Sequence, residues 1–260
     1  MLEIANLSKR YGETVALDGA SVSFAAGSIH TIMGENGSGK STLVKLLSGI
    51  VLPDRGEIRL DGVPFSGRSP AAFQARGFAT VFQEVLIAPD RTVTDNVLLG
   101  YDGIVSRRMP RSARREAARD ALALCTPLGV DLDAEAGDLP LATQQLVVLA
   151  RALVRKPRIL ILDEVTAALD FTDRETVFRL MERLAGEGCL ILFISHRMDE
   201  VMRLSSRITV LRSGKVVETL DRADATPERL LSRMAPEIVA ERAHHALPHA
   251  HEPGHEHSHG

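Results

Sequence analysis

An eight-residue stretch, GENGSGKS at residues 34–41, constrains this 260-residue chain more than any other feature. It matches the pattern GxxxxGK[ST], follows an apolar strand at 28–33 and precedes a predicted helix over 42–47. Glycines let such a loop curl until successive backbone N–H groups point inward, and the helix N-terminus adds the positive end of its dipole. This setting favours a triphosphate-binding loop over an ordinary glycine-rich turn.

Two side chains of this loop have separate expected tasks. Lys40 is placed to reach the β- and γ-phosphates, and the Ser41 hydroxyl to ligate Mg²⁺. The predicted nucleotide-contacting residues of this segment are Gly34, Glu35, Asn36, Gly37, Ser38, Gly39, Lys40, Ser41 and Thr42.

A second polar feature ends an apolar strand. Residues 159–162 read ILIL and lead into Asp163 and Glu164. Unpaired buried charge is very costly, so a buried strand that ends on two acids must use them. In a nucleotide site the first acid can hold Mg²⁺, usually through water, and the second can orient and deprotonate the attacking water. Alone, the pair would as readily cap the next helix; beside the glycine-rich loop, the nucleotide-site interpretation is favoured.

The pattern of apolar residues predicts an α/β domain with an all-helical insertion. Residues 1–90 contain short strands and turns, including strands at 57–60 and 63–65 around an Asp61-Gly62 turn. Helical spacing dominates from Thr92 to about Ala152, most clearly over 112–125. Strands and helices then alternate, and the predicted segments are strand 158–162, helix 172–184, strand 190–194, helix 198–204 and a hairpin over 208–220.

Composition excludes several classes of function. The 31 Lys+Arg against 34 Asp+Glu give a formal net charge of −3, which argues against a strongly cationic surface for nucleic acid. No apolar run reaches the roughly 18 residues that cross a bilayer, so we do not expect a membrane channel. The N-terminal residues lack a basic start and an apolar run, so we expect no export signal. Cys125 and Cys189 share no CxxC spacing and are expected to be plain thiols within structural elements.

The order of these motifs resembles the nucleotide-binding subunit of an ATP-binding cassette (ABC) transporter, over residues 1 to about 235. Four short motifs extend the likeness: Tyr11-Gly12, Gln83 in the run 81–84, Ala168-Leu169-Asp170, and His196 in the run 194–197. The resemblance implies that the Tyr11 ring stacks on adenine and that Gln83 touches Mg²⁺ and senses a membrane partner. It also implies that the 168–170 loop faces a second cassette and that His196 contacts the γ-phosphate.

The resemblance implies a P-loop NTPase fold of the ABC type at 1–236, with an antiparallel β subdomain, a RecA-like parallel-sheet core and a helical subdomain at roughly 92–155. Its expected activity is hydrolysis of ATP with Mg²⁺. The implied catalytic residues are Lys40, Gln83, Glu164 and His196, and the implied metal ligands are Ser41, Gln83 and Asp163. The implied partners are a second cassette, identical or different, transmembrane permease subunits and a periplasmic solute-binding protein. The expected location is the cytoplasmic face of the inner membrane, as a peripheral subunit, and no nucleic acid is expected.

One level finer, four segments are similar to the carbohydrate-importing branch of the family: 34–37, Gln83-Glu84, Gln144-Gln145 with 147–153, and 195–201. These similarities predict a role in sugar import. That branch commonly carries two fused cassettes, whereas this chain has one. Two alternatives stay open: an ATPase of a metal-ion importer, and a low-turnover soluble ABC protein that is not coupled to transport.

The sequence departs from the family signature, LSGGQ or its sugar-branch variants, at residues 139–143, which read LPLAT. Pro140 replaces the serine whose hydroxyl would reach the γ-phosphate of the other subunit, and proline offers neither a hydroxyl nor an N–H. Either hydrolysis at that site is weakened, or the N–H groups of Ala142 and Thr143 suffice and turnover is merely slower. Val165, where the family has proline, is a minor departure.

A histidine-rich segment forms the last part of the chain. Seven of the nine histidines lie at residues 244–259, among Pro, Gly, Ala and Glu. No apolar periodicity survives there, so we expect residues 237–260 to be disordered. The segment is either a flexible chelator of zinc, nickel or copper, or a solvated tail with incidental histidines.

Overall fold

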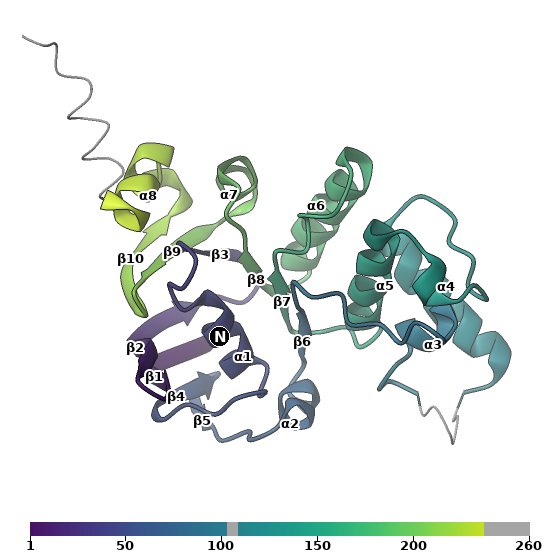
Figure 1. Cartoon of the computed structure of the whole chain (residues 1–260), viewed down its shortest axis with the longest axis horizontal. Helices are drawn as coiled ribbons and strands as arrows, with labels where there is room; N and C mark the ends of the chain where they lie inside the picture. The colour runs from purple at the N-terminus through teal and green to yellow at the C-terminus, as the bar shows by residue number, and fades with distance from the viewer. Residues whose placement is uncertain (103–108, 237–260) are drawn as a thin grey trace, which may run out of the picture.

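The computed structural model describes residues 1–102 and 109–236, and two β-sheets organise them (Figure 1). The larger sheet has six strands in the order β10-β9-β3-β8-β7-β6. Its strands are β3 (Ile29–Met33), β6 (Phe78–Val81), β7 (Ile159–Asp163), β8 (Leu190–Ile194), β9 (Arg207–Arg212) and β10 (Lys215–Asp221). All neighbouring strands pair in parallel except β10, which runs antiparallel to β9.

Strand β7, which lies between β8 and β6, shows why these segments are apolar throughout. Leu160 and Leu162 face one hydrophobic core, formed with α4, α5 and α6, whereas Ile159 and Ile161 face a second core, formed with α1 and the other sheet. Successive side chains point to opposite faces of a strand, so a sheet covered on both faces requires an uninterrupted apolar run. The same alternation holds in β8.

The smaller sheet is antiparallel and has the order β2-β1-β4-β5. Its strands are β1 (Leu2–Tyr11), β2 (Thr14–Phe24), β4 (Arg55–Leu60) and β5 (Val63–Phe65). Asp61 and Gly62 connect β4 to β5 with φ of 52° and 80°, the left-handed conformation that a tight hairpin turn requires. The predicted Asp-Gly hairpin is therefore confirmed.

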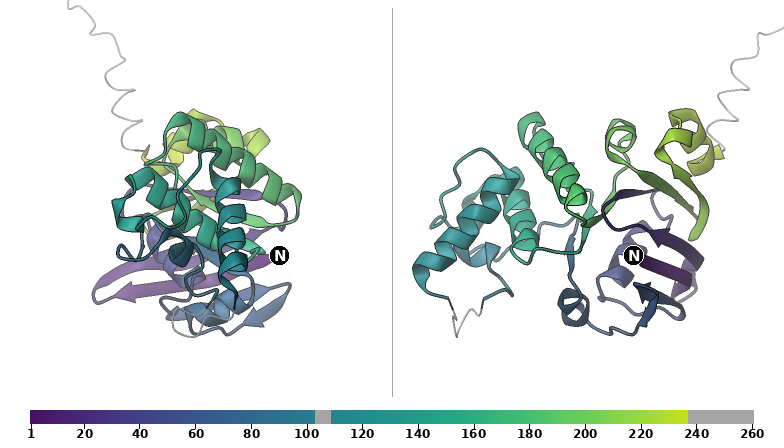
Figure 2. Two further views of the ribbon diagram at one scale, coloured as in Figure 1. Left: turned by 90° about the vertical axis from the view of Figure 1, so that its right-hand side faces the viewer. Right: turned by 180° about the vertical axis from the view of Figure 1, so that it is seen from behind.

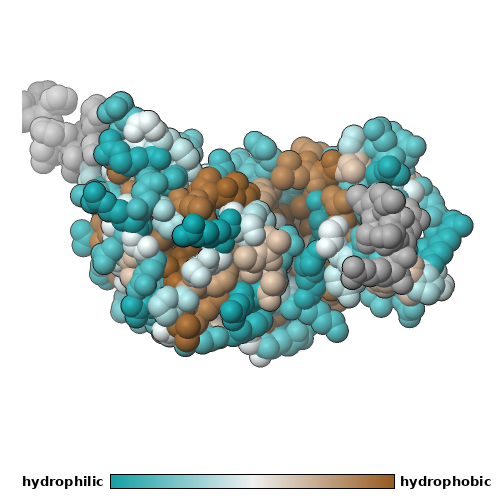
Figure 3. Space-filling model, turned by 90° about the horizontal axis from the view of Figure 1, so that it is seen from below, coloured by the Kyte–Doolittle hydropathy of each residue, from teal (hydrophilic) through white to brown (hydrophobic). Residues whose placement is uncertain are grey.

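Apolar side chains also reach the surface of the molecule. Val63 and Leu52 are 65% and 41% exposed, and Figure 3 shows hydrophobic patches among hydrophilic ones.

The helices are α1 (Lys40–Leu47), α2 (Pro70–Ala75), α3 (Val93–Val97), α4 (Arg111–Cys125), α5 (Leu141–Leu153), α6 (Phe171–Gly186), α7 (Met198–Leu204) and α8 (Pro227–Met234). Single 3₁₀ turns lie at Ala136–Asp138 and Arg222–Asp224. Helices α3, α4 and α5 gather at one end of the elongated molecule, and the antiparallel sheet lies toward the other end (Figure 2). Among the described residues, no helix is both long and apolar enough to cross a bilayer.

A buried asparagine joins the helical end to the core. Asn96, on α3, has no exposed surface, and its side-chain amide donates to the carbonyls of Ala88, Arg91 and Thr92. Its Oδ1 accepts from the Ala88 N–H and from Arg151 on α5, which also donates to Leu86 O at 2.7 Å. Buried polar groups of this kind are stable only when they are hydrogen-bonded. The segment that follows Gln83 is thereby fixed to both α3 and α5.

The α/β architecture with a helical insertion, predicted from the sequence, is confirmed. Both cysteines are buried free thiols, as expected. Sequence reasoning did not single out α2, α8 or β6, each of which is at most eight residues long. Residues 237–260, which include the histidine-rich segment, lie outside the described residues.

Candidate active site

Four loops converge at the carboxyl-terminal edge of the parallel sheet. They follow β3, β6, β7 and β8, and they carry the glycine-rich loop, Gln83, Glu164 and His196 respectively. Because parallel strands end at the same edge of a sheet, residues far apart in sequence meet there. They surround a cavity of about 510 Å³ lined by Thr14, Val15, Ala16, Asn36, Gly37, Gly39, Lys40, Ser41, Thr42, Gln83, Asp163, Glu164 and His196.

Two glycines of the loop are required by close backbone contacts. A Cβ on Gly34 would lie 2.3 Å from the Leu211 carbonyl oxygen. Gly39 has φ of 109°, and a Cβ there would lie 2.7 Å from the Ala16 oxygen and 2.9 Å from the Leu17 side chain. Any larger residue would push the loop away from the strand edges that support it.

The loop ends on a helix N-terminus suited to an anion. Gly39 is the N-cap of the eight-residue helix α1, and no side chain caps the first-turn N–H groups. The Ser38 hydroxyl is buried and has no hydrogen-bond partner in the described part of the chain. Uncapped N–H groups, a dipole end and an unpartnered hydroxyl together fit a phosphate group.

Lys40 is the buried cation of the site. Its ammonium group donates to the carbonyl oxygens of Gly34 at 2.7 Å and Glu35 at 3.0 Å. Burial lowers its pKa, while the carboxylates of Glu164, Asp163 and Glu35 oppose that effect. The side chain is therefore folded back onto its own loop. Because Lys40 also lines the cavity, its ammonium group can reach a phosphate bound there.

Asp163 is the buried acid of the site. It ends β7, is 7% exposed, and has its pKa raised to about 6 by burial first and by the neighbouring Glu164 second; Lys40 and Lys45 act in the opposite direction. The carboxylate therefore carries a desolvation cost that a bound cation would offset. Asp163, Ser41 and Gln83 lie around one cavity, as expected for the predicted metal ligands.

The oxygen atoms of Asp163, Ser41 and Gln83 fit Mg²⁺, which needs few protein ligands, better than they fit a metal ion whose ligands all come from the protein. No group of three or more His, Cys, Asp or Glu side chains among the described residues is arranged to hold a metal ion. Mg²⁺ is usually bound through one or two carboxylates, a hydroxyl, waters and substrate phosphates. One carboxylate and one hydroxyl beside a phosphate loop match that requirement.

Glu164 and His196 face each other across two neighbouring strand ends. His196 Nδ1 lies 3.3 Å from Glu164 Oε1, and the Glu164 N–H donates to the Ile194 carbonyl at 3.0 Å. Glu164 adopts φ of 51°, a conformation that costs a non-glycine residue about 1–2 kcal/mol. Strain of this kind persists only where the surrounding contacts hold the residue in place.

Six of the ten predicted nucleotide residues line the cavity, and four do not. Gly34, Glu35 and Ser38, within the loop itself, and Tyr11 are not among the lining residues. Tyr11 is 45% exposed at the end of β1, with the Lys9 ammonium 5.7 Å from its ring centre. Sequence reasoning missed Thr14, Val15 and Ala16, which carry no motif and reach the cavity only because β2 passes the loop.

The degenerate segment at 139–143 lies at the start of α5, away from this cavity. Pro140 is the N-cap of α5 and makes no side-chain capping bond, and Leu141 is 59% exposed. Gln144 donates back to the carbonyls of Leu139 at 2.8 Å and Gly137 at 3.3 Å. The helix begins at Leu141, directly after the proline, so Pro140 interrupts none of its hydrogen bonds.

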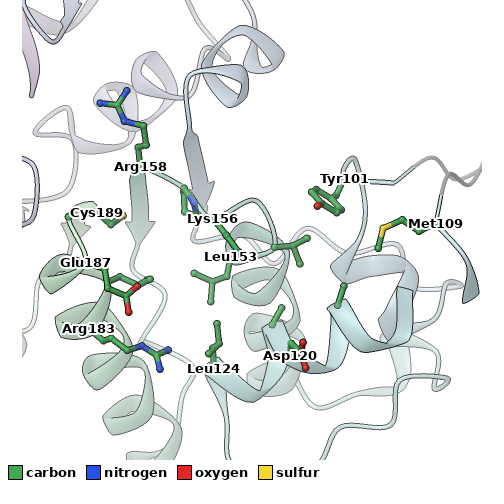
Figure 4. A pocket seen from close by; sticks show the side chains of 16 residues that line it. Tyr101, Met109, Asp120, Leu124, Leu153, Lys156, Arg158, Arg183, Glu187 and Cys189 are labelled. Atoms are coloured by element: carbon green, nitrogen blue, oxygen red, sulfur yellow. The ribbon is translucent and has the colours of Figure 1, made fainter. Parts of the chain in front are cut away.

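A second, larger cleft of about 850 Å³ lies at the opposite edge of the sheet (Figure 4). Its walls come from α4, the end of α5 and the end of α6, with Tyr101 and Met109 on one side. Apolar residues such as Leu124 and Leu153 line it, and Asp120, Arg183 and Glu187 add charge. An apolar groove with charged residues around it is typical of a surface that receives another protein segment.

Comparison with known proteins defines the class. Residues 17–167 match the sequence profile of the ABC transporter family, and the chain belongs to that family. It is 40% identical over 234 residues to the ribose import ATP-binding protein RbsA 1 of Rhizobium johnstonii, across 90% of this chain and 46% of that protein. It is 39% identical over 252 residues to the arabinose import ATP-binding protein AraG 1 of Burkholderia cenocepacia, across 94% and 49%. The chain thus spans about half the length of the curated relatives it matches.

Solved structures agree on the fold. The chain resembles the dimeric post-hydrolysis state of the ATP-binding cassette MJ0796 bound to ADP and Pi, with a TM-score of 0.77 and 27% identity over 85% of this chain and 99% of that one. It also resembles a nucleotide-free ATP-binding cassette from an ABC transporter, with a TM-score of 0.78 and 26% identity over 92% and 97%. The predicted ABC-type P-loop fold is confirmed.

The raised pKa of Asp163 predicts a pH-dependent stability. Between pH about 4 and about 6 the folded state holds more protons on this carboxyl than the unfolded state, so its contribution to stability falls as pH rises. Asp163→Asn should therefore raise the unfolding free energy of the nucleotide-free chain by about 1–3 kcal/mol at pH 7.5, and by little at pH 4. Calorimetric melting at both pH values measures this, with the surface variant Asp90→Asn as the control. An equal shift at both pH values would contradict the assignment.

Proposed function

We propose that the chain is the ATP-binding subunit of an ABC importer and that it binds and hydrolyses ATP with Mg²⁺. One observation carries this proposal: a buried lysine, an uncapped helix N-terminus, two adjacent acids and a histidine line one cavity. A cation and a helix dipole suit the triphosphate, while the acids suit a metal ion and an attacking water. We propose residues 1–236 as the ABC ATPase domain, with a helical subdomain at roughly 92–155.

Each side chain has a proposed role in hydrolysis. Lys40 leaves its loop carbonyls for the β- and γ-phosphates, and the N–H groups of the loop bind the phosphate oxygens. Ser41, Gln83 and Asp163 would hold Mg²⁺, which neutralises charge on the phosphates when bound. Glu164 orients a water and accepts its proton, and His196, 3.3 Å from Glu164, contacts the γ-phosphate.

The rest of the site is proposed to come from a second cassette. We propose that Tyr11 stacks on adenine and that the 168–170 loop and the start of α5 face the partner. The exposed apolar side chains of Val15 (42%), Leu141 (59%) and Phe171 (69%) support an interface there. The dimeric structures of a similar cassette, one bound to ADP and Pi, support the same arrangement.

The transported solute is proposed to be a sugar. The similar proteins are named as ribose and arabinose import ATP-binding proteins, which favours a pentose over the metal-ion and uncoupled alternatives. A permease would then anchor the chain at the cytoplasmic face of the inner membrane, and a periplasmic binding protein would deliver the sugar. Energy coupling requires that the cassette dimer bind ATP with different affinity in its open and closed states.

Replacing Glu164 tests hydrolysis directly. Glu164→Gln keeps the shape of the side chain but removes the proton acceptor, so ATP should still bind while turnover falls by at least about a hundredfold. The variant should therefore accumulate as an ATP-bound dimer, measurable by size-exclusion chromatography with multi-angle light scattering. The control is Glu164→Gln without nucleotide. A variant that stays monomeric at saturating Mg²⁺ and ATP would count against the sandwiched site.

Restoring the signature hydroxyl tests the role of Pro140. A lost contact to a charged phosphate is worth about 1.5–3 kcal/mol, so Pro140→Ser should raise ATP turnover by ten- to a hundredfold. Pro140→Ala, which removes the proline ring without adding a hydroxyl, is the control and should leave the rate near that of the wild type. An unchanged rate in Pro140→Ser would show that the backbone donors suffice.

We propose that the 850 Å³ cleft receives a segment of the permease, because apolar side chains line it and charged residues lie around it. Ala117 lines the cleft on α4, so Ala117→Trp should fill it without disturbing the nucleotide cavity at the other sheet edge. Reconstituted with its permease, this variant should lose at least tenfold of sugar uptake while the ATPase rate of the separate chain stays constant. Ala113→Trp, one turn earlier on α4 and outside the cleft lining, is the matched control. Full uptake in Ala117→Trp would refute docking at this cleft.

A further inference from the structure

Glu200 is a buried acid that the roles above do not use. It lies on α7, its side chain has no exposed surface, and it does not line the nucleotide cavity. A carboxylate removed from water is costly unless several groups stabilise it. The partners of Glu200 therefore indicate what it does.

Two hydroxyl groups from different loops meet on one oxygen of Glu200. Thr166 Oγ1 donates to Oε2 at 2.9 Å, and Ser195 Oγ donates to the same atom at 2.8 Å. The second oxygen, Oε1, lies 3.3 Å from Nε of Arg197 and accepts no hydrogen bond among the described residues. Thr166 and Ser195 are themselves buried, with 2% and 3% of their surface exposed.

The positions of these hydroxyls relative to the proposed reacting groups are informative. Thr166 comes two residues after Glu164, and Ser195 comes directly before His196. Two other contacts join these loops: the hydrogen bond from the Glu164 N–H to the Ile194 carbonyl at 3.0 Å, and the pair of His196 Nδ1 with Glu164 Oε1 at 3.3 Å. Glu200 thus adds a buried link between the loop that carries Glu164 and the loop that carries His196.

The helix that carries Glu200 is itself firmly anchored. Val201 and Leu204 are buried, and Val201 packs with Met33 and Ile208 in the small core beneath α7. A carboxylate on a rigid helix can fix two loops that have few other contacts. The residues proposed to hold the phosphates, by contrast, follow β3, and within residues 1–102 and 109–236 none of them is hydrogen-bonded to or ion-paired with Glu200.

We propose that Glu200 is a positioning residue that sets Glu164 and His196 at their working separation, so that it governs the hydrolytic step and leaves ATP binding intact. This inference rests on the proposed function of the site. Misplacement of a reacting group by about 1 Å can reduce a rate a hundredfold. Loss of the link should therefore lower kcat and leave the affinity for ATP close to that of the wild type.

Four variants of the 260-residue chain separate positioning from general stability. Glu200→Ala removes both acceptors, whereas Glu200→Gln keeps an amide oxygen that accepts both hydroxyls. Thr166→Val removes one hydroxyl without changing the shape. Thr126→Val is its matched control, because Thr126 Oγ1 also donates to a buried carboxylate, that of Asp173 at 2.8 Å, but at the end of α4 far from the cavity lining.

The experiment measures kcat for ATP hydrolysis, the dissociation constant of a fluorescent ATP analogue, and the melting temperature of each variant. We expect kcat to fall about 10- to 100-fold in Glu200→Ala and about threefold to tenfold in Thr166→Val, with analogue affinity within about twofold of the wild type. Glu200→Gln should recover to within about fivefold of the wild-type kcat. Thr126→Val should keep the wild-type kcat even where it melts as early as Thr166→Val.

Each contrary outcome has its own meaning. Wild-type kcat in Thr166→Val and Glu200→Ala would overturn the positioning role and leave the proposed ATPase intact. A kcat that falls equally in Thr126→Val and Thr166→Val would reduce Glu200 to a structural role. If Glu200→Ala does not fold, the kcat values of the two threonine variants and of Glu200→Gln still distinguish a positioning role of Glu200 from a structural one. A wild-type chain that binds the analogue but never hydrolyses ATP would refute the proposed function itself.

Discussion

The parallel pairing of β7 with β8 is the constraint on which the site depends. It continues past the strands through the hydrogen bond from the Glu164 N–H to the Ile194 carbonyl, at 3.0 Å. Because this bond brings the two strand ends into register, Glu164 and His196 face each other although 32 positions separate their numbers in the sequence. The left-handed φ of Glu164 is the conformational cost of turning its side chain into the cavity from a strand that must stay paired.

The electrostatics of the site follow from the same geometry. Burial lowers the pKa of Lys40 and raises that of Asp163, so each group is held against its preferred charge state. Their mutual attraction offsets part of that cost, because each carboxylate near Lys40 raises the pKa of the lysine. A phosphate beside Lys40 and a cation beside Asp163 would relieve the remainder. The folded chain thus stores an unfavourable energy that its proposed ligands release on binding.

Local motifs made most of this site predictable from sequence. The glycine-rich loop, the acid pair and His196 each follow an apolar strand, and parallel strands bring such positions to one edge. What escaped prediction depends on tertiary contacts. Ala16 carries no chemical signal, yet its carbonyl oxygen excludes any side chain at Gly39. Glu200 reads as an ordinary acid in the first turn of α7, and only the folded chain shows its two hydroxyl partners.

The cavity and the start of α5 are different parts of the chain, and in a dimer of two cassettes they would belong to different nucleotide sites. Lys40, Asp163, Glu164 and His196 share one cavity, whereas Pro140 begins a helix outside it. In the proposed sandwich, each site combines the cavity of one cassette with the α5 start of the other. Two identical copies would place a proline in both sites, whereas a different partner with a serine at that position would leave one site with all its side chains. In that arrangement, any effect of Pro140 falls on the nucleotide bound by the partner, whereas the nucleotide in the chain's own cavity meets the signature segment of the partner.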